Sequence, residues 1–154
     1  GYGYNARQLR NSIASVLGME QKLTAIVIGT GNLGHALISN FHFEECGVFL
    51  AAAFDSDQDK VGQEIAGTMV YHVADMEQYI RANPTDLAVL TLPKGAAQET
   101  AKQVASLGVR GIWNFTGVDV DAGLEGIVIE NVHFSDSLLN LGYYLREHTD
   151  RPAP

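Results

Sequence analysis

Cysteine and long apolar stretches are scarce in this chain of 154 residues. Cys46 is the single cysteine, so the chain cannot form an internal disulfide, which fits a reducing cytoplasm. No apolar run approaches the roughly 18 residues that are needed to cross a bilayer. The N-terminal residues also lack the basic segment, apolar core and cleavage site of a secretion signal. We therefore expect a soluble cytoplasmic protein with no membrane partner.

Positive charge is scarce as well. The chain has 10 lysine and arginine residues against 18 aspartate and glutamate residues, which gives a formal net charge of −8. Domains that bind DNA usually carry clustered basic residues, because these neutralise the phosphates of the backbone. The basic residues of this chain are scattered, so we expect that it does not bind DNA by itself.

Apolar segments of two kinds alternate along the chain. Some are continuous runs, as in strands that are buried on both faces of a parallel sheet, and others have helical spacing. The expected strands are residues 23–28, 48–54, 69–71, 86–92, 111–115 and 126–129, and the expected helices are residues 5–17, 33–41, 75–82 and 96–107. This alternation predicts an α/β domain with a doubly wound, mostly parallel sheet.

The last expected helix, residues 132–148, differs from the others because apolar side chains cover most of its circumference. These side chains are Leu138, Leu139, Leu141, Tyr143, Tyr144 and Leu145. Such a helix has to be buried on several sides. We expect that it packs either on its own sheet or into a partner subunit, and that residues 149–154 form a polar tail.

A glycine-rich loop, Gly29-Thr30-Gly31-Asn32-Leu33-Gly34, stands where the first expected strand meets the next helix. The first glycine permits a tight turn, the second lets the backbone approach a pyrophosphate, and the third lets the helix pack closely on the strand. The pyrophosphate is held by the free N–H groups at the helix start. The loop therefore predicts a dinucleotide-binding, Rossmann-type fold, and the alternative is a glycine-rich turn without a ligand.

Asp55 lies 21 positions after Gly34, at the end of the second expected strand. An acid at this place accepts hydrogen bonds from both hydroxyls of the adenine ribose, and it repels the 2′-phosphate of NADP. This favours NAD(H) as the cofactor. The alternative is that Asp55 only caps the turn that it forms with Ser56 and Asp57.

Two later segments, Thr91-Leu92-Pro93 and Asn114-Phe115-Thr116, end strands of the expected sheet. Ligands of open parallel sheets bind outside these carboxyl ends, so both segments are candidate walls for the nicotinamide half of the cofactor, although turn chemistry explains either one equally well. A dehydrogenase would need a proton donor or acceptor and groups that orient a substrate. We find no such set and no zinc-ligand spacing, so we predict no catalytic residue and no metal.

Several blocks of the sequence together resemble the Rex family of bacterial redox-sensing transcriptional repressors. These blocks are Gly3-Tyr4-Asn5, residues 27–37, 53–57, 60–62, 96–98, 111–115 and 128–132. The resemblance implies a homodimer that represses transcription when NADH is scarce and leaves its operator when NADH fills the site. The cofactor would then bind as a signal and would not react, and the protein would not be an enzyme.

The resemblance also implies how the chain is organised. Residues 1–18 would be a linker and first helix that follow a winged-helix domain missing from this sequence, and operator DNA would bind only through that domain. Residues 19–131 would bind NAD(H), and the helix of residues 132–148 would be exchanged between subunits, which brings Phe134 to the nicotinamide bound by the partner. His133 stands where the family usually has aspartate, which puts the link to the DNA-binding domain in doubt.

We add Ser56, Lys60, Val73 and Phe134 to the expected cofactor-binding residues of the glycine loop, Asp55 and the two strand ends. Two other functions stay open at this point. A small NAD-dependent dehydrogenase would consume NADH in the presence of a substrate. A coenzyme A-binding module, which uses a similar glycine loop, would bind CoA in place of NAD(H).

Overall fold

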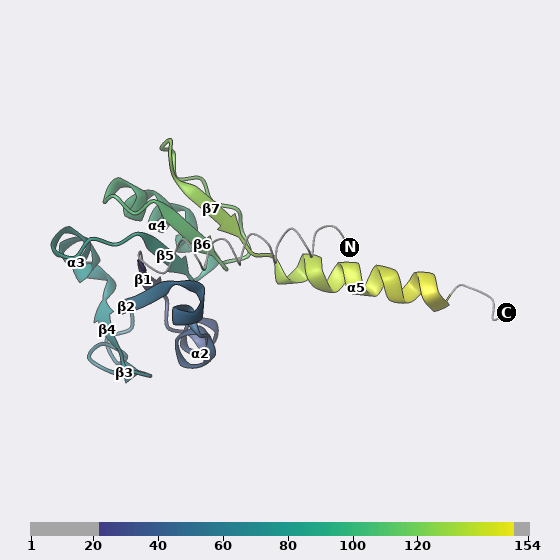
Figure 1. The fold of residues 1–154 in the computed structure, drawn as a ribbon, viewed down its shortest axis with the longest axis horizontal. Coiled ribbons are helices and arrows are strands. Elements are labelled where there is room, and N and C mark those ends of the chain that lie inside the picture. The colour runs from purple at the N-terminus through teal and green to yellow at the C-terminus, as the bar shows by residue number, and fades with distance from the viewer. Residues whose placement is uncertain (1–21, 150–154) are drawn as a thin grey trace.

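A computed structural model describes residues 22–149 (Figure 1). The expected helix of residues 5–17 and the tail of residues 150–154 lie outside the described residues. The described elements follow one another as β1 (Leu23–Ile28), α2 (Asn32–Asn40), η1 (Phe43–Cys46), β2 (Val48–Asp55), β3 (Glu64–Ile65), β4 (Thr68–His72), η2 (Val73–Asp75), α3 (Met76–Ala82), β5 (Leu87–Leu90), α4 (Lys94–Ser106), β6 (Gly111–Asn114), β7 (Val128–Asn131) and α5 (Phe134–Thr149), where η marks a 3-10 helix.

The strands form one seven-stranded sheet in the order β3-β4-β2-β1-β5-β6-β7. All neighbours are parallel except β3 and β4. From β1 the chain runs outward through β2 to β4, and then it returns to the other side of β1 with β5. The carboxyl ends of β1 and β5 therefore form the switch point at which ligands of doubly wound sheets bind. The predicted fold class is confirmed.

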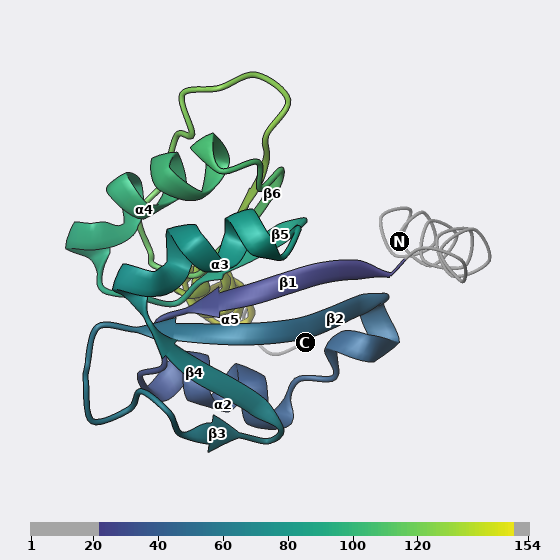
Figure 2. The ribbon, with the colours of Figure 1, turned by 90° about the vertical axis from the view of Figure 1, so that its left-hand side faces the viewer.

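Helices cover the sheet on both faces (Figure 2). Alternate residues of β1 point to opposite sides, so that Ile26 and Ile28 pack in one core with α3 and α4, and Ala25 and Val27 pack in the other core with α2. All four are almost completely buried. This double burial is the reason that β1 is a continuous apolar run.

The structure departs from the predicted elements in a few places. The short antiparallel hairpin of β3 and β4 adds a strand that the sequence analysis did not predict, because two residues are too few to show a period. Strand β5 ends at Leu90, two residues before the predicted end, and α4 begins at Lys94 instead of Ala96. The loop between β5 and α4 is therefore residues 91–93 instead of residues 93–95.

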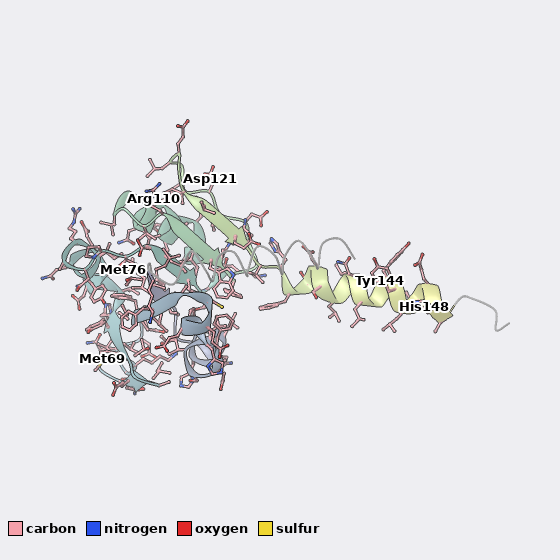
Figure 3. The ribbon with its side chains drawn as sticks, viewed as in Figure 1. Met69, Met76, Arg110, Asp121, Tyr144 and His148 are labelled. Atoms are coloured by element: carbon pink, nitrogen blue, oxygen red, sulfur yellow. The ribbon has the colours of Figure 1, made fainter. Side chains whose placement is uncertain are left out.

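Helix α5 leaves the body of the domain and extends away from it (Figure 1). It has no buried residue, and its large apolar side chains are 56–70% exposed. Figure 3 shows the side chains of α5, with Tyr144 and His148 labelled, away from the body of the domain. The helix does not pack on its own sheet in this structure, and the other predicted place, a partner subunit, stays a prediction. Within residues 22–149 no helix is both long and apolar enough to cross a bilayer.

Candidate nucleotide-binding site

A cleft of about 710 Å³ lies at the carboxyl edge of the sheet, at the switch point between β1 and β5. This volume is in the ordinary range of small-molecule sites. The residues that line the cleft are Ile28, Gly29, Gly31, Asp55, Ser56, Lys60, Val73, Ala74, Met76, Thr91, Leu92, Pro93, Ala96, Glu99, Thr100 and Gln103.

The turn after β1 is packed so tightly that it needs two of its glycines. Gly29 has a φ of +100°, and a β-carbon there would lie 2.7 Å from the backbone nitrogen of Leu92. A β-carbon at Gly34 would overlap the carbonyl oxygen of Gly29 and lie 2.7 Å from the Thr91 hydroxyl. That hydroxyl donates a 2.6 Å hydrogen bond to the Gly29 carbonyl. Gly29, Gly34 and Thr91 thus lock the start of α2 against β5.

Gly31 has a different environment. A β-carbon there would meet no protein atom within 4 Å, so this glycine faces the cleft instead of a neighbouring element. It is the N-cap residue of α2, and among the described residues no side chain caps this helix and no acid stands in its first turn. The free N–H groups and the positive end of the helix dipole suit an anion. An open backbone at the start of a helix fits the diphosphate of a dinucleotide.

Asp55 is 9% exposed and ends β2 beside the glycine loop. Its Oδ2 accepts hydrogen bonds from the backbone N–H and the hydroxyl of Thr30, at 2.8 and 2.6 Å, and its Oδ1 accepts one from the N–H of Asp57 at 2.8 Å. Burial raises the pKa of this carboxyl, but the hydrogen bonds from Thr30 and Asp57 and the charge of Lys60 lower the pKa more, to below its ordinary value. Asp55 is therefore a fixed carboxylate.

These contacts bear on two expectations from the sequence. Asp55 does cap the turn at Asp57, as the alternative interpretation held, and it lines the cleft as well. Oδ1 keeps a lone pair for a ligand, because a carboxylate has about four acceptor positions and three are used. Thr30 is 3% exposed, and its N–H and hydroxyl both donate to Asp55. It therefore holds the carboxylate in position.

One face of α4 forms a wall of the cleft that the sequence analysis missed. Ala96, Glu99, Thr100 and Gln103 follow helical spacing and all line the cleft. The signal was available, since these residues share one face of a helix that starts directly after a strand end. Ala74 in η2 and Met76 at the start of α3 were missed too, and no pattern marks them beforehand.

The strand end at Asn114 is held by its own hydrogen bonds. The Asn114 amide donates to the carbonyl of Val118 and to Oδ1 of Asn131, at 2.6 and 2.7 Å, and its oxygen accepts from the N–H and the hydroxyl of Thr116. Asn114 is 1% exposed. All of its donors and acceptors are thus used to join β6, β7 and the following turn, and its contact with a cofactor stays a prediction.

The link to α5 contains an aromatic contact and a hydrogen bond between two side chains. The rings of Phe134 and Phe115 have their centroids 5.9 Å apart, and Phe134 is 58% exposed. Nε2 of His133 lies 2.7 Å from Oδ1 of Asp119, which belongs to the loop between β6 and β7. Neither Phe115 nor Phe134 lines the cleft of this chain.

The structure therefore divides the predicted site residues into two groups. The residues that it brings together around the cleft are Gly29, Gly31, Asp55, Ser56, Lys60, Val73, Thr91, Leu92 and Pro93. The residues that it places outside the cleft wall are Thr30 below Asp55, Asn32, Leu33 and Gly34 in the first turn of α2, Asn114, Phe115 and Thr116 at the end of β6, and Phe134 at the start of α5.

Comparison with known proteins places the chain in a family. Residues 20–118 match the CoA binding domain family. The redox-sensing transcriptional repressor Rex of Caldicellulosiruptor saccharolyticus is 37% identical over 147 residues, which are 96% of this chain and 67% of the relative. Rex of Caldanaerobacter subterraneus subsp. tengcongensis is 38% identical over 147 residues, 96% of this chain and 65% of the relative. The chain spans about two thirds of the length of these relatives.

Solved structures of a Rex-family repressor also match this chain. The crystal structure of RSP, a Rex-family repressor, matches 97% of this chain and 71% of its own chain, with a TM-score of 0.83 and 37% identity. RSP bound to β-NADH, and RSP bound to β-NAD⁺ and operator DNA, each match 93% of this chain with a TM-score of 0.82 and 35% identity, over 69% and 65% of their own chains. The relatives are named as repressors, not as enzymes. The chain belongs to the CoA binding domain family and to the Rex family of redox-sensing transcriptional repressors.

Proposed function

We propose that this chain binds NAD(H) in the cleft and is the sensing part of a redox-responsive repressor. The observation that carries the proposal is the meeting of three features at one switch point: an open glycine turn, an uncapped helix start and a fixed carboxylate. A dinucleotide needs these groups for its diphosphate and its adenine ribose. RSP, which has the same fold, binds both NADH and NAD⁺.

Each part of the cofactor has candidate residues. The N–H groups around Gly31 and the first turn of α2 would hold the diphosphate, and Asp55 would accept a hydrogen bond from the adenine ribose. The nicotinamide half would lie toward Thr91, Leu92 and Pro93, because these residues line the other side of the switch point. The bound cofactor would supply the redox signal, since its reduced and oxidised forms differ at the nicotinamide.

Our proposal extends to the longer protein. The apolar surface of α5 would be covered by a second subunit, so that the protein is a homodimer and Phe134 of each subunit approaches the nicotinamide of the other. The exposed leucines of α5 support this arrangement. Operator DNA would bind through a segment outside this chain, and NADH would release it. A repressor of this kind works in the cytoplasm.

Calorimetric titrations with NADH, NAD⁺, NADPH and CoA test the proposal. We expect NADH to bind more tightly than NADPH or CoA, because the Asp55 carboxylate repels a phosphate on the ribose. The ratio of NADH to NAD⁺ affinity then measures how well the domain reports the redox state. Tight binding of CoA alone would overturn the proposal, and so would loss of NADH absorbance on addition of oxo acids.

The variant Asp55→Ala tests the ribose role of this residue. We expect weaker binding of NADH and no weakening for NADPH, because NADH loses the hydrogen bond to its ribose, whereas NADPH is also freed from the repulsion of its 2′-phosphate. Equal weakening of both ligands would contradict this role.

A further inference from the structure

Lys60 is the one cationic side chain among the residues that line the cleft. Its Nζ donates a 3.3 Å hydrogen bond to the carbonyl of Thr30 and lies 4.0 Å from Oδ2 of Asp55. The side chain is 39% exposed and the carboxylate is 11% exposed. A buried anion and a half-exposed cation thus stand together at the ribose end of the proposed site.

The loop that carries Lys60 is ordered by its own backbone. The N–H of Lys60 donates to the carbonyl of Asp57 at 3.0 Å, and the carbonyl of Lys60 accepts from the N–H of Gln63 at 3.3 Å. Two further bonds, from Gly62 to Val70 and from Val70 to Gln63, join the loop to β4. The start of the lysine side chain is therefore fixed, while its ammonium reaches the cleft on a flexible stem.

The two charges act in opposite directions on a phosphorylated ribose. The carboxylate of Asp55 already has three hydrogen bonds, and it repels a phosphate at the ribose hydroxyls. The ammonium of Lys60, next to the same carboxylate, attracts one. Asp57 and Asp59 in the same loop are exposed, and their charges are more strongly screened by solvent.

We propose that Lys60 is a specificity-determining residue, which binds a phosphate on the adenosine ribose once the opposing charge of Asp55 is removed. This inference rests on the proposed function. The preference between NAD(H) and its 2′-phosphorylated form is then a balance of the two side chains: Asp55 raises the preference for NAD(H) and Lys60 lowers it. The site is one substitution away from accepting NADPH.

A double-mutant cycle tests the balance. Binding of NADH and NADPH is measured by calorimetry for the unmodified chain, Asp55→Asn, Lys60→Met and the double variant. We expect Asp55→Asn to bind NADPH about tenfold or more tightly than the unmodified chain, because a charged hydrogen bond forms without the opposing repulsion. The double variant should lose most of this gain. In the chain that keeps Asp55, Lys60→Met should weaken NADPH more than NADH.

Lys102→Met is the matched control, because Lys102 is an exposed lysine of α4 outside the cleft. It removes the same charge and should leave the NADPH affinity of Asp55→Asn unchanged. Thermal unfolding without ligand checks that each variant folds. If the double variant binds NADPH as tightly as Asp55→Asn, or if Asp55→Asn gains no NADPH affinity, the inference fails. If the unmodified chain does not bind NADH, it is the proposed function that fails.

Discussion

At the scale of single residues, Gly31 at the N-cap of α2 and Gly34 in its first turn have different roles. Gly31 faces the cleft, and a β-carbon there meets nothing. We predict that Gly31→Ala keeps the fold, with a change in the free energy of unfolding of no more than about 1 kcal/mol, since alanine is a poorer N-cap than glycine. NADH binding should be lost, because the methyl group occupies the space of the diphosphate. Urea unfolding and calorimetry measure the two effects separately.

Gly34→Ala is the contrasting change in the same loop. Its methyl group would overlap the Gly29 carbonyl and crowd the Thr91 hydroxyl, both of which hold the turn. We expect a loss of about 1–3 kcal/mol in the free energy of unfolding, as for other overpacked sites, together with weaker NADH binding. If Gly31→Ala and Gly34→Ala changed the free energy of unfolding equally, the close packing at Gly34 would be contradicted.

Asp55 also makes stability depend on pH. Its pKa in the folded protein lies below the ordinary value of 3.8, so the folded state binds this proton more weakly than the unfolded state does. The carboxylate therefore contributes stability above that ordinary value, and the contribution disappears as the pH falls through the folded-state pKa. We predict that the stability difference between the unmodified chain and Asp55→Asn is constant near neutral pH and shrinks below pH 3.8. A difference that grows in acid would contradict this sign.

At the scale of elements, the sequence predicted those parts that have a period or a fixed turn chemistry. The buried run of β1, the glycine loop and Asp55 could be found because their residue types and spacing are required by local packing or turn chemistry. The hairpin of β3 could not be found, since two residues carry no period. The role of Asn114 could not be predicted either, because its partners Val118 and Asn131 are brought to it by β6 and β7 pairing.

Helix α5 leaves its large apolar side chains exposed within one chain. Phe134, Leu138, Leu141 and Leu145 lie on one side of it at helical spacing, and all are more than half exposed. If this stripe forms the interface of the proposed dimer, Leu141→Glu should convert that dimer to a monomer, because a charge buried in the middle of the stripe would have no partner. Analytical ultracentrifugation measures the change. Asn140→Glu, on another side of the helix, is the control and should leave the dimer intact.

At the scale of the whole molecule, the proposed dimer can complete each cleft in two ways, with Phe134 of the same chain or with Phe134 of the other. Phe134 of the same chain contacts Phe115 and does not line the cleft. In a symmetric dimer with exchanged helices, each cleft would instead receive the Phe134 of the other subunit. We predict that Phe134→Ala lowers NADH affinity without disturbing the glycine loop, since the ring would cover the nicotinamide only after the helix has crossed to its partner.

Mixed dimers distinguish the two arrangements. A Gly31→Ala subunit has a defective cleft and an intact Phe134, and a Phe134→Ala subunit has the reverse. If the helices are exchanged, unfolding and refolding the two variants together creates dimers in which the intact cleft receives the intact ring. Tight NADH binding should then return at about a quarter of all sites, because half of the dimers are mixed and each has one complete site. If each Phe134 covers its own cleft, the mixture binds no more tightly than the separate variants, because no subunit then carries both intact parts.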